Sequence, residues 1–180
     1  MLDMAEYRGD VSRLRVVEPS VGGGAFVGPI VERLAASGAP WHELRDSLRG
    51  YDLRAEHVQN CRAIARSILD SAGCPIAEEL AEAWFQVGDF LLADVPEADL
   101  VIGNPPYKDL KSGGAEDTRG YTTIGTKNLY PLCFERSLKI GGQKSRIGLI
   151  VPVSSISTEG YKSLQALVFM RNGHLSSFDD

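Results

Sequence analysis

Short apolar runs alternate with helical patterns along most of the chain, and this alternation constrains the fold more than any other feature. Each run is followed by a turn or by residues with the 3.6-residue period of an amphipathic helix. The runs expected to form strands are residues 14–18, 49–53, 84–87, 100–103 and 146–151; the expected helices begin near Val27 or cover residues 54–70 and 128–140. The pattern predicts an α/β fold: a Rossmann-like, doubly wound, mostly parallel sheet with helices on both faces.

Composition narrows the class of protein further. Of the 180 residues, 43% are hydrophobic and 24% are charged, which suits one globular domain with a core of its own. A formal net charge of -5 argues against a generally basic nucleic-acid coat. The cysteines form no CxxC pair and the histidines lack metal-ligand spacing, so we expect free thiols and no structural metal. No apolar run approaches the roughly 20 residues of a membrane span, so a soluble, cytoplasmic protein is expected.

A glycine-rich turn, EPSVGGGAF at residues 18–26, follows the first expected strand and precedes a helix. Glycines there allow the backbone to approach a ligand closely, while the helix N-terminus presents free N–H groups. The alternative is a purely steric need for glycine in a tight turn. The spacing does not match GxGxxG, and the GK[ST] of a P-loop is missing, which argues against a nucleoside triphosphate ligand.

Acidic residues follow the second and third expected strands. Asp52 lies where a doubly wound fold places a carboxylate that accepts hydrogen bonds from both ribose hydroxyls, although more than the usual ~20 residues separate it from the glycines. Asp89, in the sequence VGDFL, holds the corresponding place after the third strand, where it can accept a hydrogen bond from an adenine amino group with Phe90 beside the ring. For either aspartate alone, a turn or a helix cap is the simpler interpretation.

The tetrapeptide NPPY, residues 104–107, follows the fourth expected strand. Pro105 and Pro106 restrict the backbone, so the Asn104 side chain and the Pro105 carbonyl form a rigid pair of acceptors. Two acceptors aimed at one amino group bind both of its hydrogens and direct its lone pair at an electrophile, while Tyr107 stacks on the planar group that bears the nitrogen. A sulfonium methyl is such an electrophile and requires no base before attack. An ordinary Pro-rich turn is the alternative.

A polar segment with four glycines, residues 108–127, comes directly after NPPY and is expected to form a long surface loop. Because it leaves the carboxyl end of a strand, we expect it to be functional, and a solvated insertion is the alternative. Tyr121 offers a stacking surface, and four basic residues can contact phosphates: Lys108, Lys111, Arg119 and Lys127. Nearby acids reduce this basicity: Asp109, Glu116 and Asp117.

Taken in order, EPSVGGGAF, GYDL, GDF and VIGNPPY resemble the S-adenosylmethionine-dependent amino-methyltransferases, most closely the N6-adenine DNA methyltransferases of restriction-modification type. Residues 127–180 also resemble the segment that follows NPPY in that family, so the resemblance covers nearly the whole chain. It implies S-adenosyl-L-methionine as cofactor, bound by Glu18, Pro19, Gly22, Gly24, Phe26, Asp52, Asp89 and Phe90. It implies that the target base is held by Asn104, Pro105, Pro106 and Tyr107.

The chain departs from that family at both ends. Family members with this motif order have an N-terminal segment with a further cofactor-contacting motif, and only about a dozen residues precede the first strand here. The closing strands of the sheet and the target-recognition domain would follow Asp180. Residues 1–180 are therefore expected to be a truncated catalytic domain without the final antiparallel hairpin, with an exposed edge near a last strand at residues 175–178.

The resemblance leaves the substrate open, because NPPY indicates that the acceptor is a planar amino group but not which kind of molecule carries it. Methyl transfer to the N6 amine of adenine in DNA, flipped out of the duplex, is the preferred interpretation. A protein glutamine amide or an RNA base is the alternative acceptor, and a non-catalytic cofactor-binding scaffold is the alternative of another class. Expected partners are DNA and the other subunits of a restriction-modification or phage-defence system. The DNA recognition sequence and the oligomeric state are not encoded in these motifs.

Overall fold

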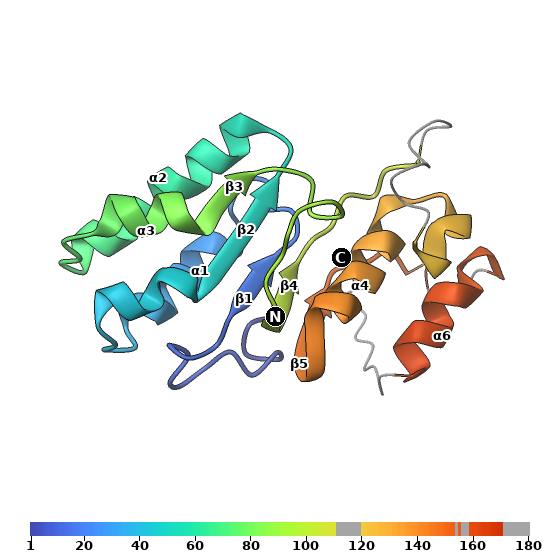
Figure 1. The fold of residues 1–180 in the computed structure, drawn as a ribbon, viewed down its shortest axis with the longest axis horizontal. Coiled ribbons are helices and arrows are strands. Elements are labelled where there is room, and N and C mark those ends of the chain that lie inside the picture. The colour runs from blue at the N-terminus through green and yellow to red at the C-terminus, as the bar shows by residue number, and fades with distance from the viewer. Residues whose placement is uncertain (111–119, 154, 156–158, 171–180) are drawn as a thin grey trace.

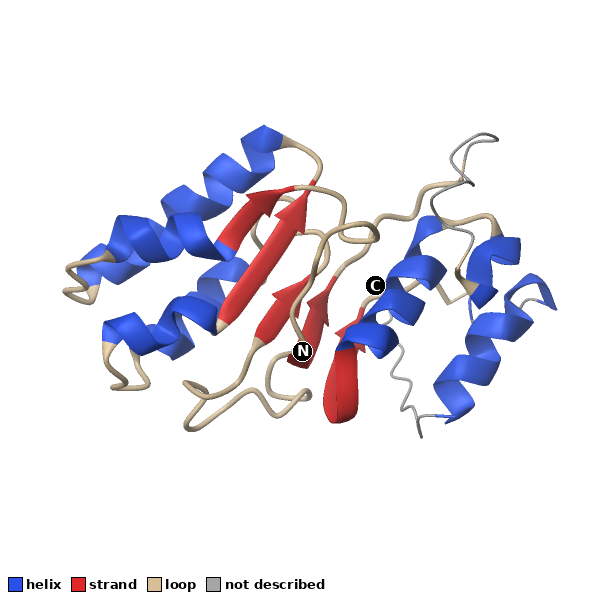
Figure 2. Cartoon of the chain, in the orientation of Figure 1, coloured by secondary structure: helices blue, strands red, loops and turns tan. Residues whose placement is uncertain are grey.

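A computed structural model describes residues 1–110, 120–153, 155 and 159–170, and within them the chain builds one parallel five-stranded sheet (Figures 1 and 2). The strands are β1 (Val16–Glu18), β2 (Leu48–Asp52), β3 (Phe85–Val87), β4 (Ala98–Gly103) and β5 (Gly141–Leu149), in the order β3-β2-β1-β4-β5. Every neighbouring pair is parallel. The predicted α/β class with a doubly wound, parallel sheet is confirmed, and the strand order reverses between β1 and β4.

Helices connect the strands. They are α1 (Val27–Ala35), α2 (Ala55–Ser71), α3 (Ala77–Trp84), α4 (Leu129–Ile140) and α6 (Lys162–Met170), with short 3-10 turns η1 (Trp41–Asp46), η2 (Thr122–Thr126) and η3 (Glu159–Tyr161). Figure 1 shows α1, α2 and α3 grouped beside β2 and β3, with α4 beside β5. No helix among the described residues is both long and apolar enough to cross a membrane.

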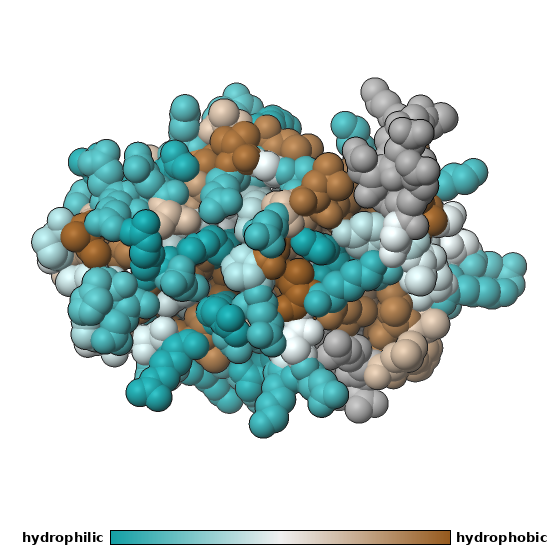
Figure 3. All heavy atoms as spheres, viewed as in Figure 1, coloured by the Kyte–Doolittle hydropathy of each residue, from teal (hydrophilic) through white to brown (hydrophobic). Residues whose placement is uncertain are grey.

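Two hydrophobic cores lie on opposite faces of the sheet, because successive strand side chains point to opposite sides. Val16 belongs to the core beneath α1, α2 and α3, whereas Val17 belongs to the core beneath α4. In β4 the same alternation places Leu100 and Ile102 in the first core and Val101 in the second. The face in Figure 3 is mostly hydrophilic, with hydrophobic residues confined to smaller patches.

The N-terminal segment belongs to the first core, which the sequence did not predict. Leu2, Tyr7 and Val11 are buried there. Arg33 of α1 donates a hydrogen bond to the Tyr7 carbonyl at 2.9 Å. The segment before β1 is therefore an integral part of the fold.

The predicted elements differ from the observed ones at α3 and β5, among other places. Helix α3 was not predicted, although Trp84 at its end is buried and donates its indole N–H to the Leu44 carbonyl at 3.0 Å. Strand β5 begins at Gly141, earlier than the predicted residue 146, because the chain passes from α4 directly into pairing with β4. The predicted last strand, residues 175–178, lies outside the described residues.

Candidate functional site

The glycine-rich turn and NPPY meet at the carboxyl ends of β1 and β4, the point where the strand order reverses. At Gly103, the last residue of β4, an added Cβ would lie 3.4 Å from Pro19 Cδ and 3.5 Å from Glu18 Cγ. The backbone that leads into NPPY is thus in near contact with the start of the glycine turn. In open α/β sheets such a reversal is the usual place for a ligand.

Hydrogen bonds to β2 hold the glycine turn. The N–H of Val21 donates to the Tyr51 carbonyl at 2.9 Å. Gly22 and Gly24 have φ values of +49° and +85°, a region that favours glycine. An added Cβ on Gly24 would lie 2.9 Å from Ile64 Cδ1 of α2, whereas one on Gly22 would meet nothing within 4 Å. The turn's need for glycine therefore accounts for both residues through their positive φ, and for Gly24 also through the contact with Ile64; the space beside Gly22 is open.

Asp52 joins the glycine turn to the start of α2. Its Oδ2 accepts the N–H of Gly22 at 3.0 Å, its Oδ1 accepts the N–H of Arg54 at 3.0 Å, and His57 Nδ1 lies 3.1 Å from Oδ2. Burial raises the pKa of this carboxyl, but the hydrogen bonds from Arg54, His57 and Gly22 outweigh burial and hold the pKa below its usual range. The turn-capping interpretation is thus correct for Asp52, whose side chain is 9% exposed.

Glu18 lies beside this turn at the end of β1 and is 1% exposed. Its Oε2 has no hydrogen-bond partner among the described residues. Burial, and secondarily the charge of Asp52, raises the pKa of Glu18 well above its ordinary value. A buried carboxyl with an unused acceptor costs free energy unless a ligand supplies a donor.

The turn after β3 lies next to Asp52, since the Gly88 N–H donates to the Asp52 carbonyl at 2.9 Å. Asp89 accepts the N–H of Leu91 on Oδ1 at 2.9 Å, so it also caps a turn. Phe90 is buried in the second core, tilted against Tyr51 with ring centroids 6.1 Å apart. The turn that carries Asp89 is therefore bonded to Asp52, and the ring of Phe90 is buried against Tyr51.

In NPPY, Asn104 and Tyr107 are exposed and Pro105 is buried. The Tyr107 hydroxyl lies 2.6 Å from Asn104 Oδ1 and 3.1 Å from the Ile150 carbonyl. The hydroxyl has one proton and can donate to only one of these acceptors at a time. The ring packs edge-on against Tyr130 at 5.9 Å, which leaves the side chain 48% exposed.

The segment after NPPY is tied to α4 by a residue that the sequence did not indicate. Glu135 is buried and accepts hydrogen bonds from the backbone N–H and the hydroxyl of both Thr122 and Thr123, at 2.9–3.0 Å. Lys139 lies 3.1 Å from the same carboxylate. Burial raises the pKa of Glu135, but these bonds outweigh burial and lower the pKa to about 2. In the sequence, Glu135 and Lys139 look like an ordinary surface pair four residues apart.

The predicted loop is closed at its base. Leu110 and Leu129 donate their N–H groups to the carbonyls of Lys127 and Lys108, at 2.8 and 3.0 Å. Lys108 and Lys127, for which phosphate contacts are predicted, are exposed. Tyr121 is partly covered by Lys139, whose Nζ lies 4.1 Å from the ring centroid. Asp109, proposed against DNA contact, is exposed and accepts a hydrogen bond from the Asn128 side chain at 3.2 Å. Four further charged residues proposed for or against DNA contact lie outside the described residues: Lys111, Glu116, Asp117 and Arg119.

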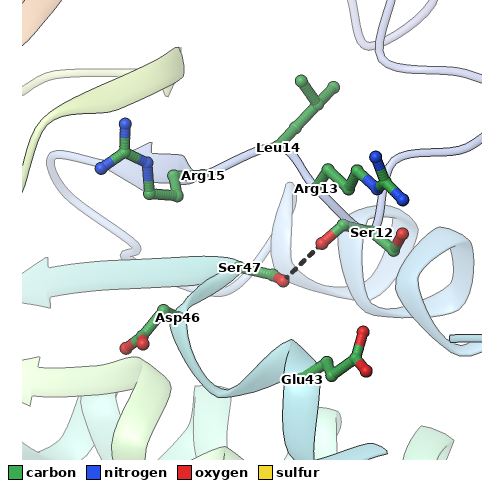
Figure 4. Close-up of a pocket in the computed structure, with 7 residues that line it drawn as sticks. All are labelled: Ser12, Arg13, Leu14, Arg15, Glu43, Asp46 and Ser47. Carbon is green, nitrogen blue, oxygen red and sulfur yellow. Dashed lines mark hydrogen bonds between the residues drawn. The ribbon is translucent and has the colours of Figure 1, made fainter. Parts of the chain in front are cut away.

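A separate pocket of about 340 Å³ lies at the amino ends of β1 and β2 (Figure 4). It is lined by residues 12–15, which precede β1, and by Glu43, Asp46 and Ser47, which precede β2. The Ser47 hydroxyl donates to the Ser12 carbonyl across it at 3.1 Å. Because it faces the amino ends of the strands, it is no part of the site formed by the glycine turn and NPPY.

The fold is that of the class I S-adenosylmethionine-dependent methyltransferases. A solved structure of a putative member of that class from Listeria monocytogenes superposes with a TM-score of 0.63 over 87% of this chain and 45% of that one, at 13% sequence identity. At that identity the likeness establishes the fold alone.

The chain belongs to the Eco57I restriction-modification methylase family, whose profile matches residues 56–180. It is 35% identical over 119 residues to the Type II methyltransferase M.PaeR7I of Pseudomonas aeruginosa, a match that covers 59% of this chain and 21% of that protein. It is 28% identical over 170 residues to the Type II methyltransferase M.XhoI of Xanthomonas vasicola, covering 83% of this chain and 31% of that protein. The chain thus spans less than a third of either relative.

Proposed function

We propose that the chain binds S-adenosyl-L-methionine and transfers its methyl group to the exocyclic N6 amine of adenine in DNA. The observation that supports this most directly is the near contact of Gly103 with Glu18 and Pro19. Because NPPY follows Gly103 directly, this supports a site in which a methyl donor on the glycine turn and an amine held by NPPY lie next to each other. Membership of a restriction-modification methylase family supports DNA as the substrate.

The residues at the sheet edge fit this cofactor. Glu18 has an unused, buried acceptor that suits the ammonium of the methionine end, and Gly22 leaves its backbone open. Asp52 keeps an ionised carboxylate for the ribose, with Asp89 and Phe90 on the adenine side. The remaining members of the proposed set shape the turn: Pro19, Gly24 and Phe26. When bound, the cofactor supplies an electrophilic methyl on a sulfonium.

The chain's own contribution to the reaction is orientation. Asn104 Oδ1 and the Pro105 carbonyl would accept the two hydrogens of the amine, which directs the nitrogen lone pair toward the methyl group. Pro105 and Pro106 hold these acceptors in place. Tyr107, half exposed and braced by Tyr130, would stack on the flipped base. No side chain needs to remove a proton before attack.

For DNA, we propose contacts from the loop after NPPY, where Lys108 and Lys127 are exposed at its base. Residues 1–180 would then form the catalytic domain, or most of it, and other parts of the protein or partner subunits would recognise the sequence. Such partners would be those of a restriction-modification or phage-defence system.

The test uses the protein at its full natural length, with S-adenosylmethionine and unmethylated genomic DNA. After digestion to nucleosides, mass spectrometry should detect N6-methyldeoxyadenosine. Calorimetric titration with S-adenosylhomocysteine measures cofactor-site binding separately. Methylated cytosine, or methylation of RNA or protein only, would refute adenine in DNA as the acceptor. Binding without any transfer would support the scaffold alternative.

A further inference from the structure

Side chains from beyond NPPY hold the turn after β3, which includes residues 89–90 proposed for the adenine side of the cofactor site. The Tyr121 hydroxyl donates to the Leu91 carbonyl at 3.1 Å. Arg136 Nη2 of α4 donates to the Ala93 carbonyl at 2.8 Å. Both acceptors are backbone groups of the turn itself, so these bonds set the path of the backbone that presents residues 89–90.

Tyr121 is in turn held by α4. Lys139 Nζ lies 4.1 Å from the centre of its ring and donates to the Gly120 carbonyl at 2.8 Å. The two threonines that follow Tyr121 are bound by the buried carboxylate of Glu135, which also pairs with Lys139. Tyr121 is therefore fixed by its neighbours in sequence and by a cation over its ring, and its hydroxyl reaches a turn 30 residues earlier in the chain.

We propose that Tyr121 is a positioning residue for the adenine side of the cofactor site, and that Glu135 keeps Tyr121 in place. The inference rests on the proposed function and extends it. Without the hydroxyl, the turn samples other conformations, and the ligand binds only the fraction that is competent, which raises the apparent Kd. Since Tyr121 and Glu135 follow NPPY in the chain, DNA contacts that favour the Tyr121–Leu91 hydrogen bond would also strengthen cofactor binding, and by linkage the reverse holds.

Four variants of the full-length protein test this by calorimetric titration with S-adenosylhomocysteine: Tyr121→Phe, Glu135→Gln, the double variant, and Tyr7→Phe as control. Tyr7→Phe removes a hydroxyl from the other core, far from the turn. A neutral hydrogen bond limits the expected effect of Tyr121→Phe to about a 3- to 10-fold rise in Kd. The double variant should bind no more weakly than the weaker single variant, because both act through one contact.

A second readout separates positioning from general loss of stability. Duplex DNA should lower the Kd of S-adenosylhomocysteine for the wild-type protein. The ratio of the Kd without DNA to the Kd with DNA should fall toward 1 in Tyr121→Phe. If Tyr121→Phe binds S-adenosylhomocysteine within twofold of the wild-type protein, or if the effects of the two single variants add, the inference is wrong. If the wild-type protein does not bind S-adenosylhomocysteine, the proposed function fails, and the inference fails with it.

Discussion

Asn104 follows the last residue of β4, and its side-chain oxygen lies 2.6 Å from the Tyr107 hydroxyl, within hydrogen-bond distance. Asn104→Ala should leave S-adenosylhomocysteine affinity nearly intact but cut methyl transfer roughly 10²-fold or more, the scale for one preorganised polar group. Asn104→Asp keeps an acceptor and should retain more activity than alanine. Single-turnover rates with labelled S-adenosylmethionine measure methyl transfer by both variants. Transfer by Asn104→Ala at the wild-type rate would mean that NPPY is only a turn.

Tyr107 combines an exposed ring with a hydroxyl shared between Asn104 and the Ile150 carbonyl. Tyr107→Ala should chiefly impair capture of the flipped base, since the stacking surface is lost. A mismatched or abasic partner opposite the target adenine lowers the cost of flipping and should restore part of the activity. Tyr107→Phe, which retains the ring, is the matched control and should capture the base far better than alanine. An equal loss of methyl transfer in Tyr107→Ala and Tyr107→Phe would contradict a stacking role.

Asp52 has the turn-capping task that the sequence suggested, because its carboxylate accepts the N–H groups of Gly22 and Arg54. The same residue is proposed to bind the ribose. Asp52→Ala should weaken S-adenosylhomocysteine binding by about 1.5 to 3 kcal/mol, the range for a hydrogen bond to a charged group. Asp52→Asn keeps a side-chain acceptor for the turn and should preserve the melting temperature better than alanine. Unchanged affinity in a folded Asp52→Ala protein would remove the residue from the site.

At the scale of elements, the attachment of η2 to α4 depends on the ionised Glu135. The folded pKa of about 2 lies below the ordinary value of 4.5, so its contribution to stability is complete above pH 4.5 and is lost as the pH falls toward 2. Glu135→Gln should lower the free energy of unfolding at neutral pH by about 1.5 to 3 kcal/mol. Denaturant titrations from pH 7 to 3 should show this difference shrinking as the pH falls. Glu82→Gln, on the exposed face of α3, is the control and should show no such trend.

At the scale of the whole molecule, the net charge of -5 means that the proposed DNA binding depends on local basic groups. The curated relatives are several times longer than the part they share with this chain. A polypeptide of residues 1–180 should therefore bind duplex DNA weakly, with little sequence preference and with steep loss of affinity as salt rises. Fluorescence anisotropy from 50 to 300 mM NaCl measures this. Tight, salt-resistant binding to one short duplex would contradict the assignment of recognition to other parts of the protein.

Local patterns in the sequence were sufficient to predict where the five strands lie along the chain, and that the glycine turn, Asp52, Asp89 and NPPY each follow a strand. Each is a matter of period or turn chemistry within a few residues. The tertiary structure alone shows that Gly50 is required, since an added Cβ would lie 2.6 Å from Val21 Cγ1 and 2.7 Å from Phe85 Cδ1. It alone joins Tyr121 to Leu91 and places the glycine turn against Gly103. These contacts connect residues from 29 positions apart (Val21 and Gly50) to 85 positions apart (Glu18 and Gly103), and which distant groups meet is decided by packing of the whole chain.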